Sequence, residues 1–168
     1  LPVLRQPEPA CYQRQLQCEL LTGAHRRRQP STSLHDLKVR QAISHVIPRD
    51  DLIKQIIKPS QGIPAFSFLM PGFPASNSDG LKDIQSYDPA TAKSLLADAG
   101  FPGGAGFPKL TLWLRNEAPV RQSVASAIAA SITQNLGIQV DVSNKENKTF
   151  TDAMNAKPPQ IQFGMVSY

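Results

Sequence analysis

The sequence predicts an α/β fold in which a mainly parallel sheet of at least three strands is flanked by about five helices. The first observation is a strand–helix–strand unit over 110–142, where two short apolar segments enclose a long helical one. Such a unit requires parallel strands and a right-handed crossover. The second observation is composition. A chain of 168 residues that is 40% hydrophobic can bury a core and is too apolar to be disordered.

Two helices are predicted at the start of this fold. The first covers about 36–46, has apolar residues at helical spacing, and begins at Asp36 or Ser33, which are favoured N-cap residues. Pro48 ends this helix or opens the next one. The second helix is short, and two aspartates lie in its first turn, where the helix dipole favours them.

Residues 59–87 are predicted to form a loop, because prolines and glycines recur along them. Phe66, Phe68 and Phe73 lie among these residues. A long loop with this much apolar content must pack on the rest of the chain or be covered by a partner. We expect the three aromatic side chains to pack on the neighbouring helices.

A further helix is predicted to begin at Asp88, because an aspartate followed by a proline is a favoured start. Gly100 ends this helix. Its predicted buried stripe consists of Ala92, Leu95, Leu96 and Ala99. The glycine-rich turn over 102–106 lacks the spacing of a phosphate-binding loop.

The remaining elements, in order, are a strand over 110–114, a helix over about 119–136, a strand over 138–142, a helix over about 148–155 and a strand over 161–166. Asn116 and Pro119 open the long helix, and Gly137 ends it. The predicted core line of that helix is Val120, Val124, Ile128, Ile132 and Leu136.

Residues 1–33 differ from the rest and are set apart as a leader or linker. They carry a net charge of +3, whereas the remainder carries +2, so the basic character belongs partly to this segment. The run Arg26–Arg28 contacts an anion or belongs to a solvated linker. Cys11 and Cys18 also lie here, and two cysteines alone form no disulfide framework.

No catalytic or metal-binding pattern is found, so we expect neither an enzyme nor a cofactor. The nucleophile-elbow and zinc-protease motifs are missing. His35 and His45 are ten residues apart, which places them on different faces of a helix. The first-turn position of Asp50 and Asp51 explains these carboxylates without catalysis.

Three segments resemble one protein family in the same order. Residues 36–44 resemble a D-x-x-V-R-Q-A-I helix, and residues 87–102 resemble a Y-D-P-x-x-A-K-x-L-L-x-x-A-G-[YF]-P stretch. Leu136–Val140 resembles an L-x-x-[IL]-G-I-x-V segment. These motifs are similar to those of bacterial extracellular solute-binding proteins of family 5, over about residues 34–168.

The resemblance implies that residues 34–168 form one periplasmic-binding-protein-like lobe, inserted in a two-lobed substrate-binding protein of an ABC importer and ending before the lobe is complete. It implies capture of a small solute, above all a peptide, by closure of two lobes. The implied partners are the first lobe and a membrane permease, with no nucleic acid. The implied location is periplasmic or extracellular, with a lipoprotein anchor on the parent protein. Dipeptides, oligopeptides, nickel chelates, sugars and opines all remain open as ligands.

Four residues are predicted to face the ligand cleft of this lobe: Arg115, Asn116, Met165 and Tyr168. Ligands of open α/β sheets collect at the carboxyl ends of the strands. Arg115 would attract a carboxylate, and Tyr168 would stack on the ligand or hydrogen-bond to it. The structural alternatives for the four are a surface salt bridge, a helix cap, core packing and a frayed chain end.

Two other functions remain open. The chain could be a standalone protein-interaction module that keeps this fold without transport, or a basic nucleic-acid binder that uses the arginines of residues 1–33. The cleft face that the first lobe would cover also predicts self-association of the isolated lobe.

Overall fold

The computed structural model describes residues 33–57, 63–67, 69, 72–116 and 118–165. The helices in this part of the chain are α1 (Leu37–His45), α2 (Arg49–Leu52), α3 (Ser78–Gln85), α4 (Pro89–Asp98), α5 (Pro119–Leu136) and α6 (Asn147–Asn155). The strands are β1 (Leu110–Arg115), β2 (Val140–Lys145) and β3 (Gly164–Met165). The predicted leader up to residue 32, with both cysteines and the arginine run, lies outside the described residues, as does Tyr168.

The described strands form one parallel sheet in which β1 is central. The strand order is β2-β1-β3. β1 pairs with β2 along its whole length, from Leu110 opposite Val140 to Arg115 opposite Lys145. On its other side, β1 pairs with β3 at Trp113 and Leu114. The predicted α/β class with a parallel sheet is confirmed, and the carboxyl ends of the three strands lie at the same edge.

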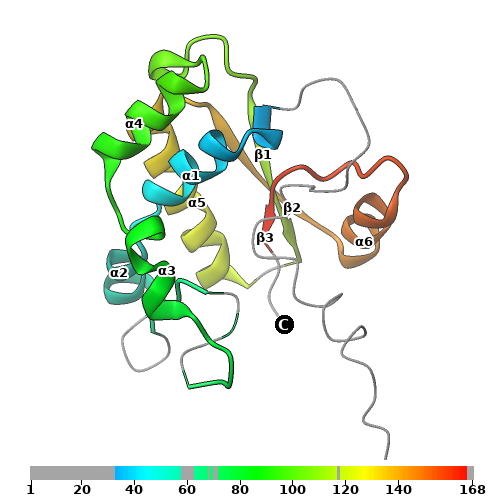
Figure 1. Cartoon of the computed structure of the whole chain (residues 1–168). Helices are drawn as coiled ribbons and strands as arrows, with labels where there is room; N and C mark the ends of the chain where they lie inside the picture. The colour runs from blue at the N-terminus through cyan, green and yellow to red at the C-terminus, as the bar shows by residue number, and fades with distance from the viewer. Residues whose placement is uncertain (1–32, 58–62, 68, 70–71, 117, 166–168) are drawn as a thin grey trace, which may run out of the picture.

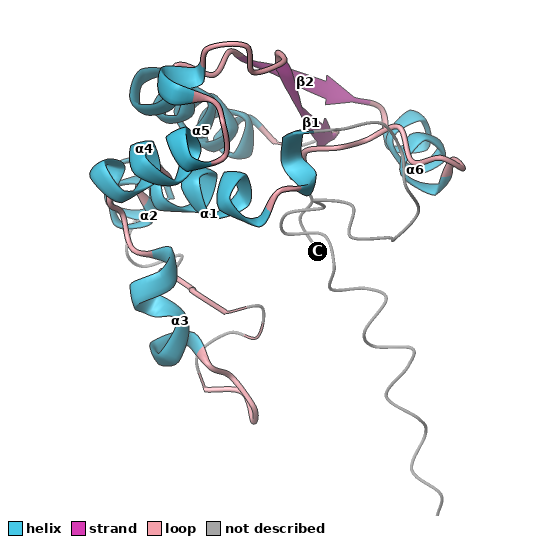
Figure 2. Cartoon of the chain, turned by 45° about the horizontal axis from the view of Figure 1, so that its top comes forward, coloured by secondary structure: helices cyan, strands magenta, loops and turns pink. Residues whose placement is uncertain are grey.

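Helices cover the two faces of the sheet unequally. Figures 1 and 2 show α1, α4 and α5 on one side of the strands and α6 on the other. α5 carries the chain from the end of β1 back to the start of β2, as a parallel connection requires. The result is a thick helical layer, the sheet, and a thin second layer.

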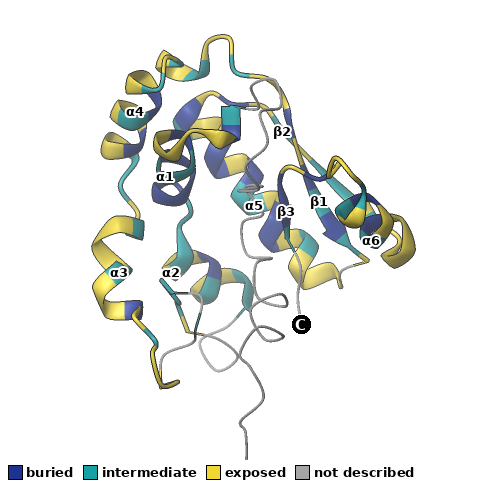
Figure 3. Cartoon of the chain, turned by 45° about the vertical axis from the view of Figure 1, so that its right-hand side comes forward, coloured by how far each residue is buried: buried dark blue, intermediate teal, exposed yellow. Residues whose placement is uncertain are grey.

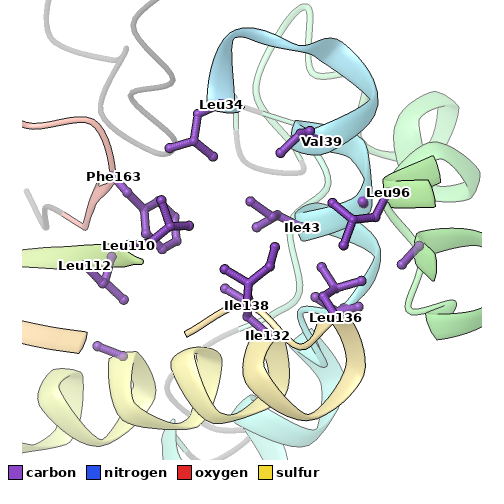
Figure 4. Close-up of a cluster of buried hydrophobic side chains, with 14 of the residues drawn as sticks. Leu34, Val39, Ile43, Leu96, Leu110, Leu112, Ile132, Leu136, Ile138 and Phe163 are labelled. Atoms are coloured by element: carbon purple, nitrogen blue, oxygen red, sulfur yellow. The ribbon is translucent and has the colours of Figure 1, made fainter. Parts of the chain in front are cut away.

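The main core lies between β1 and the thick helical layer (Figure 4). The exposed fractions of Leu110, Leu112 and Leu114 are 4%, 2% and 0%, because alternate residues of a strand share one face. Their partners in the buried cluster come from all three helices and from the segment before β3, and include Ile43, Leu96, Ile132, Leu136 and Phe163. The buried face of β1 and the predicted buried stripe of α4 therefore belong to the same core.

A second, smaller cluster covers the opposite face of β1. Trp113 is half-buried there and packs against Phe150 and Ala153 of α6 and against Ile161. Figure 3 shows that most of the remaining surface of α6 is exposed. Among the described helices, α6 alone thus shields this face.

Three of the predicted helix ends are confirmed. The carboxylate of Asp36 accepts a hydrogen bond from the backbone N–H two residues on, at 2.8 Å. Asp88 accepts from the backbone N–H groups of Ala90 and Thr91 at 3.0 and 3.1 Å. Gly137 ends α5 with a φ of 72°, and a Cβ there would collide with the carbonyl oxygen of Gly103. Glycine is therefore required by both conformation and space.

The loop predicted over 59–87 is wrong in one part, because α3 forms inside it and raises the helix count to six in the described residues. Contacts from distant residues stabilise this helix. The buried hydroxyl of Ser78 accepts the backbone N–H of Phe66 at 3.1 Å, and the guanidinium of Arg49 donates to the backbone oxygen of Gln85 at 2.7 Å. Local propensity did not indicate the helix, because Gly80 lies in its first turn.

The aromatic residues of this segment do not share one environment. Phe66 is half-buried, with the Arg49 guanidinium 5.5 Å from its ring centroid, which confirms the expected packing. Phe73 is 53% exposed, so the expectation is wrong there. Phe68 lies outside the described residues.

The bounds of all three strands differ from the prediction, those of β1 only in that the strand extends to Arg115. β2 begins at Val140 and not at Ile138, because Ile138 is 1% exposed and packs into the main core before the ladder starts. β3 covers Gly164–Met165 in the described residues, against a predicted strand over 161–166. In the described residues, β3 pairs with β1 only near the carboxyl end of β1.

The predicted core line of α5 fails at its N-terminal end. Val120 is 51% exposed, whereas Ile132 and Leu136 are buried. Residues spaced four apart drift by about 40° per step around a helix with 3.6 residues per turn, so one line cannot stay in the core over the whole helix.

Asp88 predicts a pH dependence of folding stability. Hydrogen bonds from the Thr91 side chain and backbone lower the pKa of Asp88 from its ordinary value of 3.8. Its stabilising contribution is therefore present above the unfolded-state pKa and is lost as the pH falls through the lower folded-state pKa. Urea unfolding of the wild type and of Asp88→Asn, which keeps a capping oxygen, should show a stability difference at neutral pH that shrinks in acid. A difference that is the same at every pH would contradict this role of the charge.

Candidate functional site

Three polar residues, two of which were predicted to belong to the site, lie together at the carboxyl ends of the strands. Arg115 ends β1 and lies opposite Lys145, which ends β2. The backbone N–H of Asn116 donates to the carbonyl oxygen of Lys145 at 2.7 Å, which locks the two strand ends to each other. Met165 follows on β3, opposite Leu114. We call these four residues, Arg115, Asn116, Lys145 and Met165, the carboxyl edge.

Arg115 lies on the α6 side of the sheet, as the strand alternation predicted. It is half-buried, shares its face with Trp113, and already engages a partner within the protein. A guanidinium held at a strand end presents several N–H donors in a fixed fork, which suits a carboxylate.

Asn116 is exposed and is not the cap of α5. That helix begins at Pro119 with Ala118 at the N-cap position, so the predicted capping alternative is wrong. Asn116 instead has a φ of 46°, in the left-handed region that asparagine tolerates better than most residues. This turn directs the chain away from β1 immediately after the strand.

Met165 and Tyr168 differ in what the structure says of them. Met165 is half-buried and packs against the main core cluster, so its side chain joins the core layer at the strand end. Tyr168 lies outside the described residues. Of the four predicted residues, the structure thus places Arg115, Asn116 and Met165 at adjoining strand ends.

Lys145 is the residue that sequence reasoning missed. Its ammonium nitrogen lies 5.3 Å from the centroid of the Trp113 ring, within the range of a cation–π interaction. The predicted strand over 138–142 ended too early to include it. With the predicted strand starts, Leu110 would lie opposite Ile138 and Arg115 opposite Ser143. The pairing of Lys145 with Arg115 therefore comes from the register that the structure shows. Two basic side chains therefore end two neighbouring strands.

Other groups in the described residues lie apart from this edge. In the part of the chain that the structure describes, no set of three histidine, cysteine or acidic side chains lies close enough to hold a metal ion, and no helix is long and apolar enough to cross a membrane. His45 is buried, and its Nδ1 lies 2.7 Å from the carbonyl oxygen of Ser86, a structural contact between α1 and the end of α3. The carboxyl edge is thus the candidate site that the sheet geometry favours.

The comparison with protein families gives a match over most of the chain. The model described as bacterial extracellular solute-binding proteins, family 5 Middle, matches residues 7–167. The match includes the motif segments noted above and also most of the N-terminal segment set apart there.

Two curated relatives share about a third of their aligned residues with this chain. The periplasmic oligopeptide-binding protein OppA of Salmonella typhimurium is 32% identical over 121 residues, which cover 70% of this chain and 22% of the relative. The periplasmic murein peptide-binding protein MppA of Escherichia coli is 35% identical over 124 residues, which cover 71% and 22%. The chain thus spans about a fifth of the length of these relatives.

Solved structures support the same fold. The structure of Escherichia coli MppA aligns with a TM-score of 0.58 at 28% identity, covering 75% of this chain and 25% of that one. The structure of NikA from Brucella suis, in complex with Fe(III)-EDTA, aligns with a TM-score of 0.64 at 24% identity, covering 82% and 28%. The second likeness concerns the fold alone.

Because Trp113 is the single tryptophan, its fluorescence reports on the carboxyl edge. We expect Lys145→Gln to reduce quenching by iodide, an anion that the ammonium group attracts to the ring, and to leave quenching by neutral acrylamide unchanged. Lys82→Gln, which removes the same charge from α3, is the matched control and should alter neither. Equal changes with both quenchers would indicate altered exposure of the ring and contradict the electrostatic assignment.

Proposed function

Because the chain belongs to the bacterial extracellular solute-binding proteins, family 5, we propose that it serves as one lobe of the substrate-binding protein of an ABC importer. The observation that carries this proposal is the family match over residues 7–167. The share of the relatives that the chain covers, 22%, is consistent with a single lobe. In the proposed organisation, residues 34–168 form the lobe and residues 1–33 precede it.

The proposed mechanism is capture without chemical change. Solute-binding proteins are not enzymes as a family, and the role of the lobe is to close on a solute together with a second lobe. The carboxyl edge supplies this lobe's wall of the cleft. Both curated relatives are named as peptide-binding, so a peptide is the first ligand class to test. A peptide suits such a cleft because its main-chain groups can be bound whatever its side chains.

Each residue of the carboxyl edge has a proposed role. Arg115 and Lys145 place two cationic groups at neighbouring strand ends, where they would attract the carboxylate of a peptide. Asn116 offers an exposed amide beside them. Met165 and Tyr168 would complete the wall on the β3 side, with apolar and aromatic contacts respectively.

The proposed partners and location follow from the family. The closed protein would present its surface to the importer's permease in the membrane. Both curated relatives are named as periplasmic, and a periplasmic or extracellular location, with a lipoprotein anchor, is proposed for this protein.

Titration of the ¹⁵N-labelled chain with short peptides, followed by NMR, tests the proposal. We expect shifts of the backbone amides that end β1, β2 and β3, because the peptide would contact the carboxyl edge. The same peptides amidated at their C-termini are the matched ligand control. They should bind roughly ten- to a hundredfold more weakly, because a hydrogen bond to a charged group contributes about 1.5–3 kcal/mol.

The variant Arg115→Ala should weaken binding of the free-acid peptides and remove most of their advantage over the amidated ones. Shifts confined to α3 or α4 would place binding elsewhere and contradict the proposed site. The absence of shifts with every peptide, while sugars or metal chelates produce them, would replace the peptide with another solute class.

A further inference from the structure

The strand β2 forms one edge of the described sheet. The strand order β2-β1-β3 leaves β2 with a strand neighbour on one side only. Backbone groups alternate in direction along a strand, and the carbonyl oxygens of Gln139 and Lys145 both accept hydrogen bonds from β1 or the residue after it. The main-chain groups of Val140 and Val142 therefore point away from β1. They offer a place where another strand can pair.

A shallow, open hollow accompanies this edge on the α5 side of the sheet. Small side chains of α5, among them Ser126, Ala129 and Ala130, line it together with Val140 and Val142 of β2. Small residues let another helix approach closely. The hollow and the strand edge are continuous, because the two valines belong to both.

The charges on the other face of β2 are complementary to a second copy of the same strand. Asp141, Ser143 and Lys145 share the face that carries Arg115 and Trp113. If two β2 strands run antiparallel with Ser143 on the two-fold axis, Asp141 of each copy lies opposite Lys145 of the other. The carboxylate of Asp141 already binds Lys109 at 2.7 Å, and its second oxygen is available as an acceptor.

We propose that β2 is the interface of a homodimer, in which two copies pair their β2 strands in antiparallel fashion about Ser143. The two sheets then form one continuous sheet, and the α5 helices of both copies lie side by side on one face. The partner is a second copy of this chain, because a two-fold axis places the acidic residue of each β2 strand opposite the basic residue of the other. Cross-strand pairs of opposite charge stabilise such a ladder, and like charges destabilise it. This interface shares Lys145 with the carboxyl edge. The dimer is measured without any ligand, so the proposal does not depend on the proposed function.

A charge-reversal cycle measured by sedimentation velocity over a wide range of concentrations tests the proposal. The wild-type chain should form a dimer. Asp141→Lys and Lys145→Asp should each weaken dimerisation by roughly tenfold, because each places two like-charged pairs across the axis. The double variant D141K/K145D should recover most of the loss, since it restores both opposite-charge pairs. Circular dichroism verifies that each variant is folded.

A covalent probe fixes the register independently. In a chain with Cys11→Ser and Cys18→Ser, Ser143→Cys should form an intermolecular disulfide on mild oxidation, because residues directly opposite each other lie within reach. Gln139→Cys, on the same face but away from the axis, should not. A chain that is monomeric at all concentrations, or a dimer that the charge reversals leave unchanged, would overturn the proposal.

Discussion

The packing of α5 across one face of β1 and β2 is the contact on which the other features depend. Two adjacent parallel strands can be joined only by a connection that returns the length of the sheet, and here α5 makes it. The buried leucines of β1 require a cover, and Ile132 and Leu136 of α5 provide part of it. Since α5 sets the position of β2 relative to β1, it also determines which residues meet at the carboxyl edge.

The elements that sequence reasoning found share a physical property, namely that their signals are local. The caps at Asp36 and Asp88, the stop at Gly137 and the alternation of β1 depend on neighbouring residues, and all four match the structure. α3 was missed because its stability comes from residues distant in sequence, through the contacts of Ser78 and Arg49. The start of β2 was predicted too early because Ile138 is apolar, as a residue of a buried strand would be, although it lies before the first strand pair.

Residues of the candidate site could be predicted only where the end of their strand was predicted closely. Arg115 and Asn116 were found because the end of β1 was predicted to within one residue. Lys145 was missed because it lies three residues beyond the predicted end of its strand. The contact between its ammonium group and Trp113 depends on the register of two strands joined by a long helix, which no local pattern encodes. The chemistry of a side chain was thus easier to predict than the strand pairing that determines which residues lie beside it.

The unequal layers have a consequence for motion. The thick layer buries residues from three helices against β1, whereas α6 is held mainly through Phe150, Ala153 and Ile161 around one tryptophan face. Regions with few buried apolar contacts open locally at a lower free-energy cost than the core of the same domain. The backbone amides of α6 should therefore exchange their hydrogens faster than those of α5. The carboxyl edge lies between this densely packed layer and the thin one. In the proposed role as a ligand wall, movement of α6 would let that wall adapt to solutes of different bulk without disturbing the sheet.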